Sequence, residues 1–290
     1  MAIFILLFLV ATQAATAQKD GDIITRTRHT FAPYSDVNGI QRYASEDEYK
    51  RTLEDKRFVL ERLTYSSDTL PVVAYLYRAT NAVGKYPVIV FNRGGYRDTS
   101  ISLYAAMMRR LASSGFIVIA PMLRGSEGAP GEDQLGGLEL HDVMNAAKLA
   151  AQLEFADPAN LFLYGESRGG MMTYQAIRDG FPARAAAVVG AYTDQAAMLE
   201  AQPQLKKLTD DLWKTETPAE ALRRRSAIQF VDKLSVPILI QHGAADQSVA
   251  AAQSLEIAAR LQTLKLPYQL IIYDGDNHVL TKIAMLATSQ

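Results

Sequence analysis

The chain has 290 residues, of which 49% are hydrophobic and 21% are charged, so it can bury a sizeable core and is not expected to be disordered. Its 30 basic and 31 acidic residues give a formal net charge of -1, which is not the basic footprint of a nucleic-acid-binding protein. The sequence has no cysteine, which excludes disulfides, thiolate catalysis and cysteine-bound metals.

An apolar stretch, MAIFILLFLV, opens the chain, and small residues follow it in ATQAATAQKD. Ala15, Thr16 and Ala17 fit the small-x-small pattern of a signal-peptide cleavage site. Residues 1–17 are therefore predicted to be a signal peptide, and we expect an exported protein, either periplasmic or secreted. The apolar run 2–11 is about half as long as a membrane-spanning helix needs to be, so stable membrane insertion is not expected.

Residues 18–85 are expected to form an N-terminal extension that ends in the first strands of the fold. A serine at 45 followed by acidic residues predicts a helix over 45–58. Two stretches rich in β-branched and aromatic residues, 57–65 and 70–79, predict a pair of strands joined by a short turn. Residues 23–43 are mixed and polar, and no element is predicted there.

From residue 86 to residue 290 the pattern alternates between buried strands and helices. Continuous β-branched runs predict the strands, and longer amphipathic runs predict the helices. The strands are expected at 86–92, 116–121, 160–165, 185–192, 236–243 and 268–274, and the helices at 100–115, 137–154, 168–180, 248–264 and 279–287. This alternation predicts a mostly parallel sheet with helices on both faces.

Residues 194–232 break this alternation with polar helical stretches that contain Pro203, Pro218 and the single tryptophan, Trp213. In a doubly wound fold such an insertion lies over the carboxyl ends of the strands, where the active sites of open sheets form. We interpret the segment as a small helical lid, and an inert surface excursion is the alternative.

The residues 165–169, GESRG, fit the pattern G-x-S-x-G and lie between a predicted strand and a predicted helix. A tight turn there lifts the serine hydroxyl clear of its surroundings, and side chains two residues away on either side would clash. The helix that follows points its N-terminus at the hydroxyl and stabilises developing negative charge. Ser167 is therefore the predicted nucleophile.

A serine nucleophile requires a base and an orienting carboxylate, which follow it in the order acid, then histidine. His278, in the loop after the last predicted strand, is the predicted base, whereas His242 ends a strand and is expected to be structural. Asp246 follows the preceding strand and is the predicted acid. Asp274 and Asp276 lie too close to the base in sequence to orient it from a separate strand, so we interpret them as loop-forming residues.

The oxyanion that forms during acyl transfer needs two hydrogen-bond donors. One is predicted to be the backbone N–H of Arg168, the residue after the nucleophile. The other is expected from the glycine-containing turn 92–95, either as a backbone N–H near Gly94 or as the side-chain amide of Asn92.

The charged side chains that flank the nucleophile, Glu166 and Arg168, have two possible roles. They bind a charged end of the substrate, or they pair with neighbours such as Arg124 or Glu127. Structural pairing is the favoured interpretation.

The segments 123–146, 164–176 and 236–278 together resemble the catalytic domain of the prolyl oligopeptidase family of serine peptidases. The resemblance covers residues 86–278 and implies an α/β-hydrolase fold. Well-known members carry a β-propeller ahead of this domain, and the preceding residues of this chain are too few for even a small one. The family often uses a tyrosine side chain as the oxyanion donor beside the third strand, where this chain has Asn92. The family's nucleophile, acid and base correspond to Ser167, Asp246 and His278.

These observations predict a serine peptidase of the prolyl oligopeptidase type that acts on small peptides through an acyl-enzyme. We expect neither a cofactor nor a metal, because no set of histidines and carboxylates has ligand spacing. A carboxylesterase that uses the same triad is the alternative, and a non-catalytic binding protein on a hydrolase scaffold is a third hypothesis.

Overall fold

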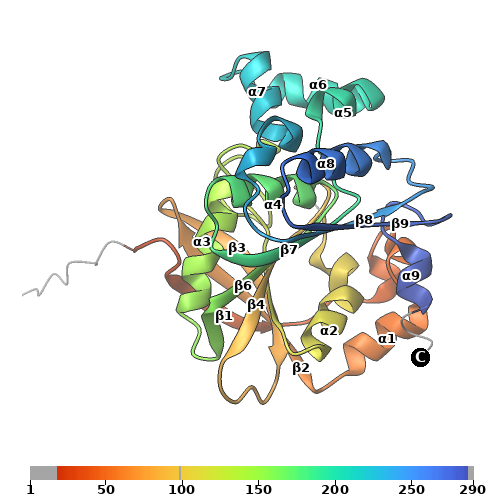
Figure 1. Ribbon diagram of the computed structural model, residues 1–290. Coiled ribbons are helices and arrows are strands. Elements are labelled where there is room, and N and C mark those ends of the chain that lie inside the picture. Colours follow the sequence, from red (N-terminus) through yellow and green to blue (C-terminus); the bar gives the residue numbers. More distant parts are fainter. Residues whose placement is uncertain (1–17, 98, 287–290) are drawn as a thin grey trace, which may run out of the picture.

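A computed structural model of the protein describes residues 18–97 and 99–286, so the predicted signal peptide, residues 1–17, lies outside the described residues (Figure 1). The strands of this part of the chain form a single nine-stranded sheet in the order β1-β2-β3-β5-β4-β6-β7-β8-β9. They are β1 Ile23–His29, β2 Phe58–Ser67, β3 Leu70–Ala79, β4 Tyr86–Asn92, β5 Ile117–Pro121, β6 Ala156–Glu166, β7 Ala183–Val189, β8 Ile238–Gly243 and β9 Tyr268–Tyr273.

Two parts of this sheet differ in strand direction. From β4 and β5 through β9 every neighbouring pair is parallel, whereas β1, β2, β3 and β5 pair in antiparallel fashion. The predicted pair β2 and β3 is confirmed, and its turn has positive φ at Asp68 and Thr69, as the tight hairpin turns require. Strand β1, for which the mixed sequence gave no prediction, is a half-exposed strand at the edge of the sheet.

Helices cover both faces of the sheet (Figure 1). The helices α3, α4 and α8 bury one hydrophobic cluster, and α1 and α2 bury a second cluster on the opposite face. The helices are α1 Glu46–Glu54, α2 Ala105–Ser113, α3 Leu140–Ala151, α4 Arg168–Arg178, α5 Gln195–Ala201, α6 Pro203–Leu212, α7 Pro218–Arg225, α8 Ala252–Thr263 and α9 Thr281–Leu286. Ser45 caps α1 as predicted, because its hydroxyl accepts a hydrogen bond from the backbone N–H of Glu48.

Alternation along the central strands divides the core between the two faces. In β4 the side chains of Val88 and Val90 belong to the cluster under α3 and α4, whereas Ile89 and Phe91 belong to the cluster under α2. Because successive residues of a strand point to opposite faces, an apolar run that is continuous in sequence indicates a strand covered on both sides. The predicted mostly parallel sheet with helices on both faces is therefore confirmed.

The insertion contains the helices α5, α6 and α7, which stand together at the top of Figure 1, beyond α8. It leaves the sheet at the carboxyl end of β7 and returns to the amino end of β8. Because parallel strands share their direction, the loops after β4, β6, β8 and β9 open at the same edge of the sheet as this insertion. The predicted site residues lie in these loops.

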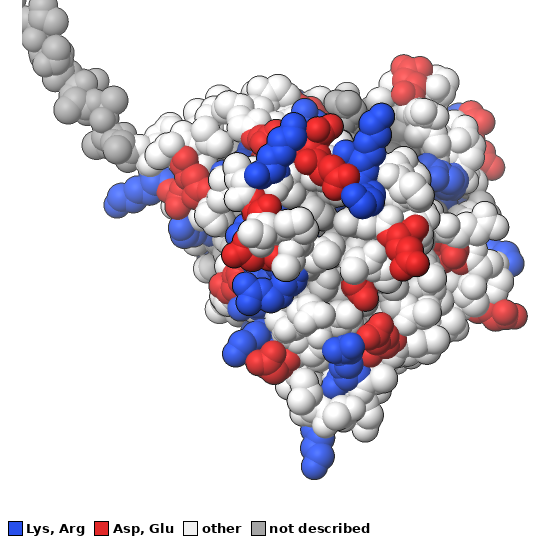
Figure 2. Space-filling view, turned by 90° about the horizontal axis from the view of Figure 1, so that it is seen from above, with Lys and Arg blue, Asp and Glu red and all other residues white. Residues whose placement is uncertain are grey.

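Acidic and basic side chains are interspersed on the face of the molecule seen in Figure 2, and no continuous basic surface lies on that face. Among the described residues, no helix combines the length and the apolar character that crossing a bilayer would require.

Candidate active site

Ser167 lies at the turn between β6 and α4, with φ of 56° and ψ of -120°. This is a strained conformation for a residue other than glycine, and it is the one expected of a nucleophile on a tight strand-to-helix turn. A Cβ at Gly169 would lie 1.8 Å from the carbonyl oxygen of Asn92, and one at Gly165 would lie 2.4 Å from the carbonyl oxygen of Gly169. Steric exclusion on both sides of the serine therefore explains the two glycines of the motif.

Asp246 and His278 meet at the same edge of the sheet, although 32 residues separate them in sequence. The Nδ1 atom of His278 lies 2.6 Å from Oδ2 of Asp246. The other carboxylate oxygen accepts hydrogen bonds from the backbone N–H groups of Ser248 and Val249. Since Nδ1 faces a carboxylate, it carries the proton, and Nε2 is left as the acceptor that a general base requires.

His242 is a second histidine on the same carboxylate, a contact that sequence reasoning did not foresee. It is fully buried, and its Nε2 lies 3.0 Å from Oδ2 of Asp246 and 2.9 Å from the carbonyl oxygen of Val249. Its Nδ1 lies 2.7 Å from the Ser254 hydroxyl. Two acceptors face Nε2, so that nitrogen is protonated, and the ring serves to hold Asp246 in place.

The hydrogen-bond donors around Asp246 keep its carboxyl group ionised. Burial on its own would raise the pKa of Asp246, but hydrogen bonds from His242, His278 and the Val249 backbone outweigh it and hold the pKa well below its usual range. Asp276, one of the competing carboxylates, instead accepts hydrogen bonds from the backbone N–H groups of residues 277, 282 and 283. It shapes the loop that carries His278, as predicted for a loop-forming residue.

Ser167 and His278 line one cleft of about 440 Å³, a volume typical of small-molecule sites. No hydrogen bond joins the Ser167 hydroxyl to His278 within the described residues, and such contacts are often long in unliganded enzymes. The imidazole packs on the backbone of Gly190, where a Cβ would lie 2.9 Å from Nδ1 of His278. Sequence reasoning missed Gly190, which lies within the predicted strand 185–192, whereas β7 ends at Val189.

The predicted oxyanion donors are placed in different ways. The backbone N–H of Arg168 begins α4 and makes no hydrogen bond to another described residue. The Asn92 amide is directed away from this role, because it is buried and donates to Thr173 Oγ1 at 2.9 Å. The N–H of Gly94 donates to the Tyr104 hydroxyl, which leaves the N–H of Gly95, also in the cleft wall, without a partner among the described residues.

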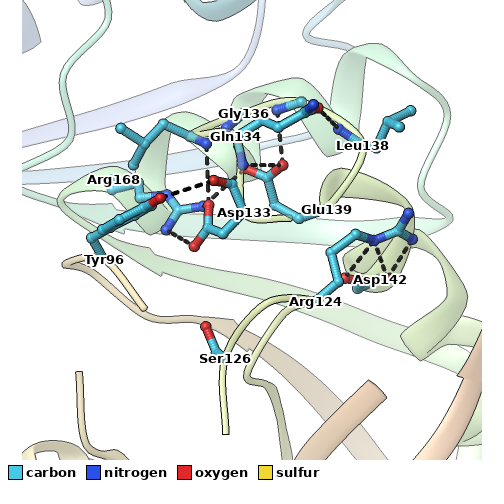
Figure 3. Close-up of polar contacts among 12 residues, drawn as sticks. Tyr96, Arg124, Ser126, Asp133, Gln134, Gly136, Leu138, Glu139, Asp142 and Arg168 are labelled. Carbon is cyan, nitrogen blue, oxygen red and sulfur yellow. Dashed lines mark hydrogen bonds and ion pairs between the residues drawn. The ribbon is translucent and has the colours of Figure 1, made fainter. Parts of the chain in front are cut away.

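The side chain of Arg168 is buried in an ion-pair cluster with Asp133 and Glu139 (Figure 3). Its Nη1 donates to Oδ2 of Asp133 at 2.8 Å and to the carbonyl oxygen of Gly95 at 3.2 Å, and its Nη2 donates to Oε1 of Glu139 at 2.9 Å. The predicted structural pairing of Arg168 is thus present, but with these two carboxylates rather than with Glu127. The guanidinium ties the turn after β4 to the start of α4.

Both carboxylates of this cluster lie in the loop between β5 and α3, and their pKa values shift in opposite directions. Burial raises the pKa of Glu139. For Asp133 the charge and hydrogen bonds of Arg168 outweigh burial and lower the pKa. The insertion is fixed to the same loop, because the Trp213 indole donates to the carbonyl oxygen of Gln134 and Arg225 donates to that of Leu135.

Replacing Arg168 with methionine is expected to lower the free energy of unfolding by about 3–5 kcal/mol, because it leaves Asp133 and Glu139 buried without their cation. Urea denaturation of the variant and of the wild type measures this difference. Lys206→Met is the control, since it breaks a pair with Asp210 in which both side chains are more than half exposed and is expected to change stability little. If both variants lost a similar, small amount of unfolding free energy, the ion-pair cluster of Arg168 would not have the structural role assigned to it.

A mostly parallel sheet with a serine on a strained strand-to-helix turn defines the α/β-hydrolase class. The family model described as the prolyl oligopeptidase family matches residues 102–286, so the chain belongs to that family and is a serine-type peptidase or hydrolase. The resemblance seen in the sequence is thereby confirmed. A second model, platelet-activating factor acetylhydrolase isoform II, matches residues 23–128, a range that contains none of Ser167, Asp246 and His278.

The chain is also similar to individual peptidases in sequence and in structure. The chain is 26% identical to the uncharacterized peptidase YtmA of Bacillus subtilis (strain 168), over 76% of this chain and 86% of that protein. It is 25% identical to the acylamino-acid-releasing enzyme of Homo sapiens, over 70% of this chain and 30% of that protein. The solved structure of a puromycin-hydrolyzing peptidase of Mycobacterium tuberculosis matches with a TM-score of 0.64 and 26% identity, over 77% of this chain and 36% of that one. The chain thus spans about a third of the length of the last two.

Proposed function

We propose that the protein hydrolyses small peptides or peptide-like amides through a triad of Ser167, His278 and Asp246 and an acyl-enzyme intermediate. The observation that carries this proposal is the 2.6 Å contact between Asp246 and His278 beside a cleft that also contains Ser167. Support for peptide-like substrates comes from the names of relatives, a peptidase of B. subtilis and a puromycin-hydrolyzing peptidase of M. tuberculosis. We also propose export, which rests on the sequence of residues 1–17 alone.

The proposed reaction begins when Nε2 of His278 takes the proton of the Ser167 hydroxyl and Oγ forms a bond to the scissile carbonyl carbon. The backbone N–H groups of Arg168 and Gly95 donate to the resulting oxyanion. The tetrahedral intermediate then breaks its carbon–nitrogen bond, and the imidazolium of His278 returns the proton to the leaving amine. The same imidazole then deprotonates a water molecule, which attacks the acyl-enzyme carbonyl. The ester bond to Oγ breaks, the imidazolium returns its proton to Ser167, and the acid is released. Asp246 holds the ring in the required tautomer and stabilises the imidazolium.

Size favours short substrates. The cleft has a volume of about 440 Å³, and the insertion forms part of its wall through Met198, Leu205 and Leu208. A cleft of this volume holds a few residues around the scissile bond.

An aminoacyl anilide and a short acyl ester, tested on the same preparation, distinguish the peptidase from the carboxylesterase. We expect both substrates to be hydrolysed and a fluorophosphonate to modify Ser167, which mass spectrometry of a digest measures. Hydrolysis of the ester alone would favour the carboxylesterase, because esters need less protonation of the leaving group. A folded protein that leaves Ser167 unmodified would favour the non-catalytic binding protein.

A further inference from the structure

Glu166 lies directly before the nucleophile and lines the cleft together with Tyr43 from the N-terminal extension. The residue is 6% exposed. The proposed reaction gives it no task. It is therefore a buried carboxyl group at the reacting centre without an assigned role.

Other buried glutamates of this chain are each neutralised by arginine. Glu48 pairs with Arg110, Glu61 with Arg26 and Arg78, and Glu139 with Arg168. Glu166 differs, because no lysine or arginine of the described residues forms an ion pair with it. An unpaired carboxylate is costly to bury, so this one is suited to a cation that arrives from outside.

The pKa of Glu166 is consistent with a buried carboxyl group that has no cationic partner. Burial raises its pKa to about 7, although the charge of His278, the Tyr43 hydroxyl and the charge of Arg42 act in the opposite direction. A cation bound against the carboxyl group would favour its ionised form. Among residues 18–97 and 99–286, none places a lysine or arginine nitrogen within ion-pair distance of this carboxyl group.

The part of the cleft that the insertion lines has a different character. Met198, Leu205 and Leu208 of the insertion present apolar side chains, and Gln202 and Gln204 add neutral polar groups. The cleft thus combines an acidic residue next to the nucleophile in the chain with an apolar surface from the insertion. A ligand that matches both walls carries a positive charge next to an apolar group.

We propose that Glu166 binds the α-ammonium group of an unblocked aminoacyl substrate whose apolar side chain packs against the insertion. This proposal rests on the proposed hydrolysis at Ser167 and specifies its substrate class. In such a substrate a single carbon atom separates the ammonium nitrogen from the scissile carbonyl carbon. Because Glu166 and Ser167 line the same cleft, a substrate bound there can place its amine against the carboxyl group while its carbonyl meets Oγ.

The test compares leucine p-nitroanilide with its N-acetyl derivative, which keeps the side chain and the leaving group but has no charge. Leucine methyl ester and N-acetylleucine methyl ester repeat the comparison, so that it holds whichever leaving group the enzyme accepts. Wild-type protein is expected to prefer the free amine by at least about tenfold in kcat/KM. Glu166→Gln is expected to remove about 10- to 100-fold of kcat/KM for the free amine, and so to bring the ratio of the two substrates close to one.

Glu200→Gln is the matched control, because it makes the same chemical change at an exposed position of α5 and is expected to keep the wild-type ratio. The rate of fluorophosphonate labelling and the thermal unfolding of Glu166→Gln report whether Ser167 is still reactive and the chain folded. Equal kcat/KM values of the wild type for the free amine and its N-acetyl derivative would overturn the proposal. So would a fall of kcat/KM in Glu166→Gln by the same factor for both substrates. A wild type that is neither labelled nor active on any of the four substrates refutes the proposed hydrolysis itself.

Discussion

Replacing Ser167 with alanine is expected to lower kcat by about six orders of magnitude on any anilide or ester that the wild type hydrolyses. The substitution removes the atom that attacks the carbonyl and leaves the cleft otherwise intact. The loss should fall on kcat rather than on KM, because the groups that bind the substrate in the ground state remain. Steady-state kinetics at high enzyme concentration, with a burst assay for the acyl-enzyme, measure both parameters.

The same variant should be nearly as stable as the wild type. The Ser167 hydroxyl makes no hydrogen bond to another described residue, and alanine meets the same backbone strain at φ of 56° as serine does. Thermal unfolding therefore separates a catalytic role from a structural one, and a large fall in the melting temperature would mean that the hydroxyl supports the fold. Urea-unfolded wild type is the control for fluorophosphonate labelling, since a serine outside its folded site is not expected to react.

The elements that carry the site could be predicted because each has a local signal. The nucleophile turn lies between an apolar strand and a new apolar pattern, and the glycines beside Ser167 are required by contacts closer than a Cβ allows. Asp246 and His278 follow successive strands, and a parallel sheet brings such loops to one edge. Chain order and sheet geometry were therefore sufficient to place these residues at one edge.

The contacts that complete the site have no such signal. Tyr43 reaches the cleft from a polar extension whose sequence resembles a surface loop. The contact of His242 with Asp246 depends on a turn of four residues after β8, and nothing in the residue types predicts it. The partners of Arg168 lie 29 and 35 residues earlier in the chain, in an irregular loop. Long-range pairing of this kind is decided by packing rather than by pattern.

Glu166 and Arg168, the two residues that flank the nucleophile, are both charged in sequence but have different surroundings in the structure. Both are charged, and both were expected to pair with neighbours. Arg168 turns into the protein, where two carboxylates neutralise it, while Glu166 lines the cleft and forms no ion pair among the described residues. Successive residues at the turn point in different directions. The charge of Arg168 therefore stabilises the fold, and the carboxyl group of Glu166 is the one that we propose binds a ligand.

Replacing Asp246 with asparagine is expected to lower kcat by about four orders of magnitude. One carboxylate oxygen accepts from two backbone N–H groups and the other from His242 and His278, so every neighbour of this group is a donor. If the amide oxygen keeps the backbone contacts, the NH₂ group faces Nδ1 of His278. The imidazole must then carry its proton on Nε2, where it cannot accept the proton of Ser167.

Stability offers a second measurement on the same variant. Because the pKa of Asp246 is held below its usual value, its ionised form stabilises the folded state above about pH 4, and that contribution is lost as the pH falls further. The difference in unfolding free energy between the wild type and Asp246→Asn should therefore shrink below about pH 4. A difference that grows on acidification would mean that the carboxyl group is protonated in the folded protein.

Asp274→Asn is the control for the assignment of the acid, because Asp274 is a competing carboxylate in the loop before His278 and is exposed. It is expected to keep wild-type kcat within about threefold, as a surface substitution away from the reacting atoms does. If Asp246→Asn stayed close to wild-type activity while Asp274→Asn lost it, the orienting role would belong to the loop carboxylate. The 2.6 Å contact between Asp246 and His278 would then be a structural ion pair.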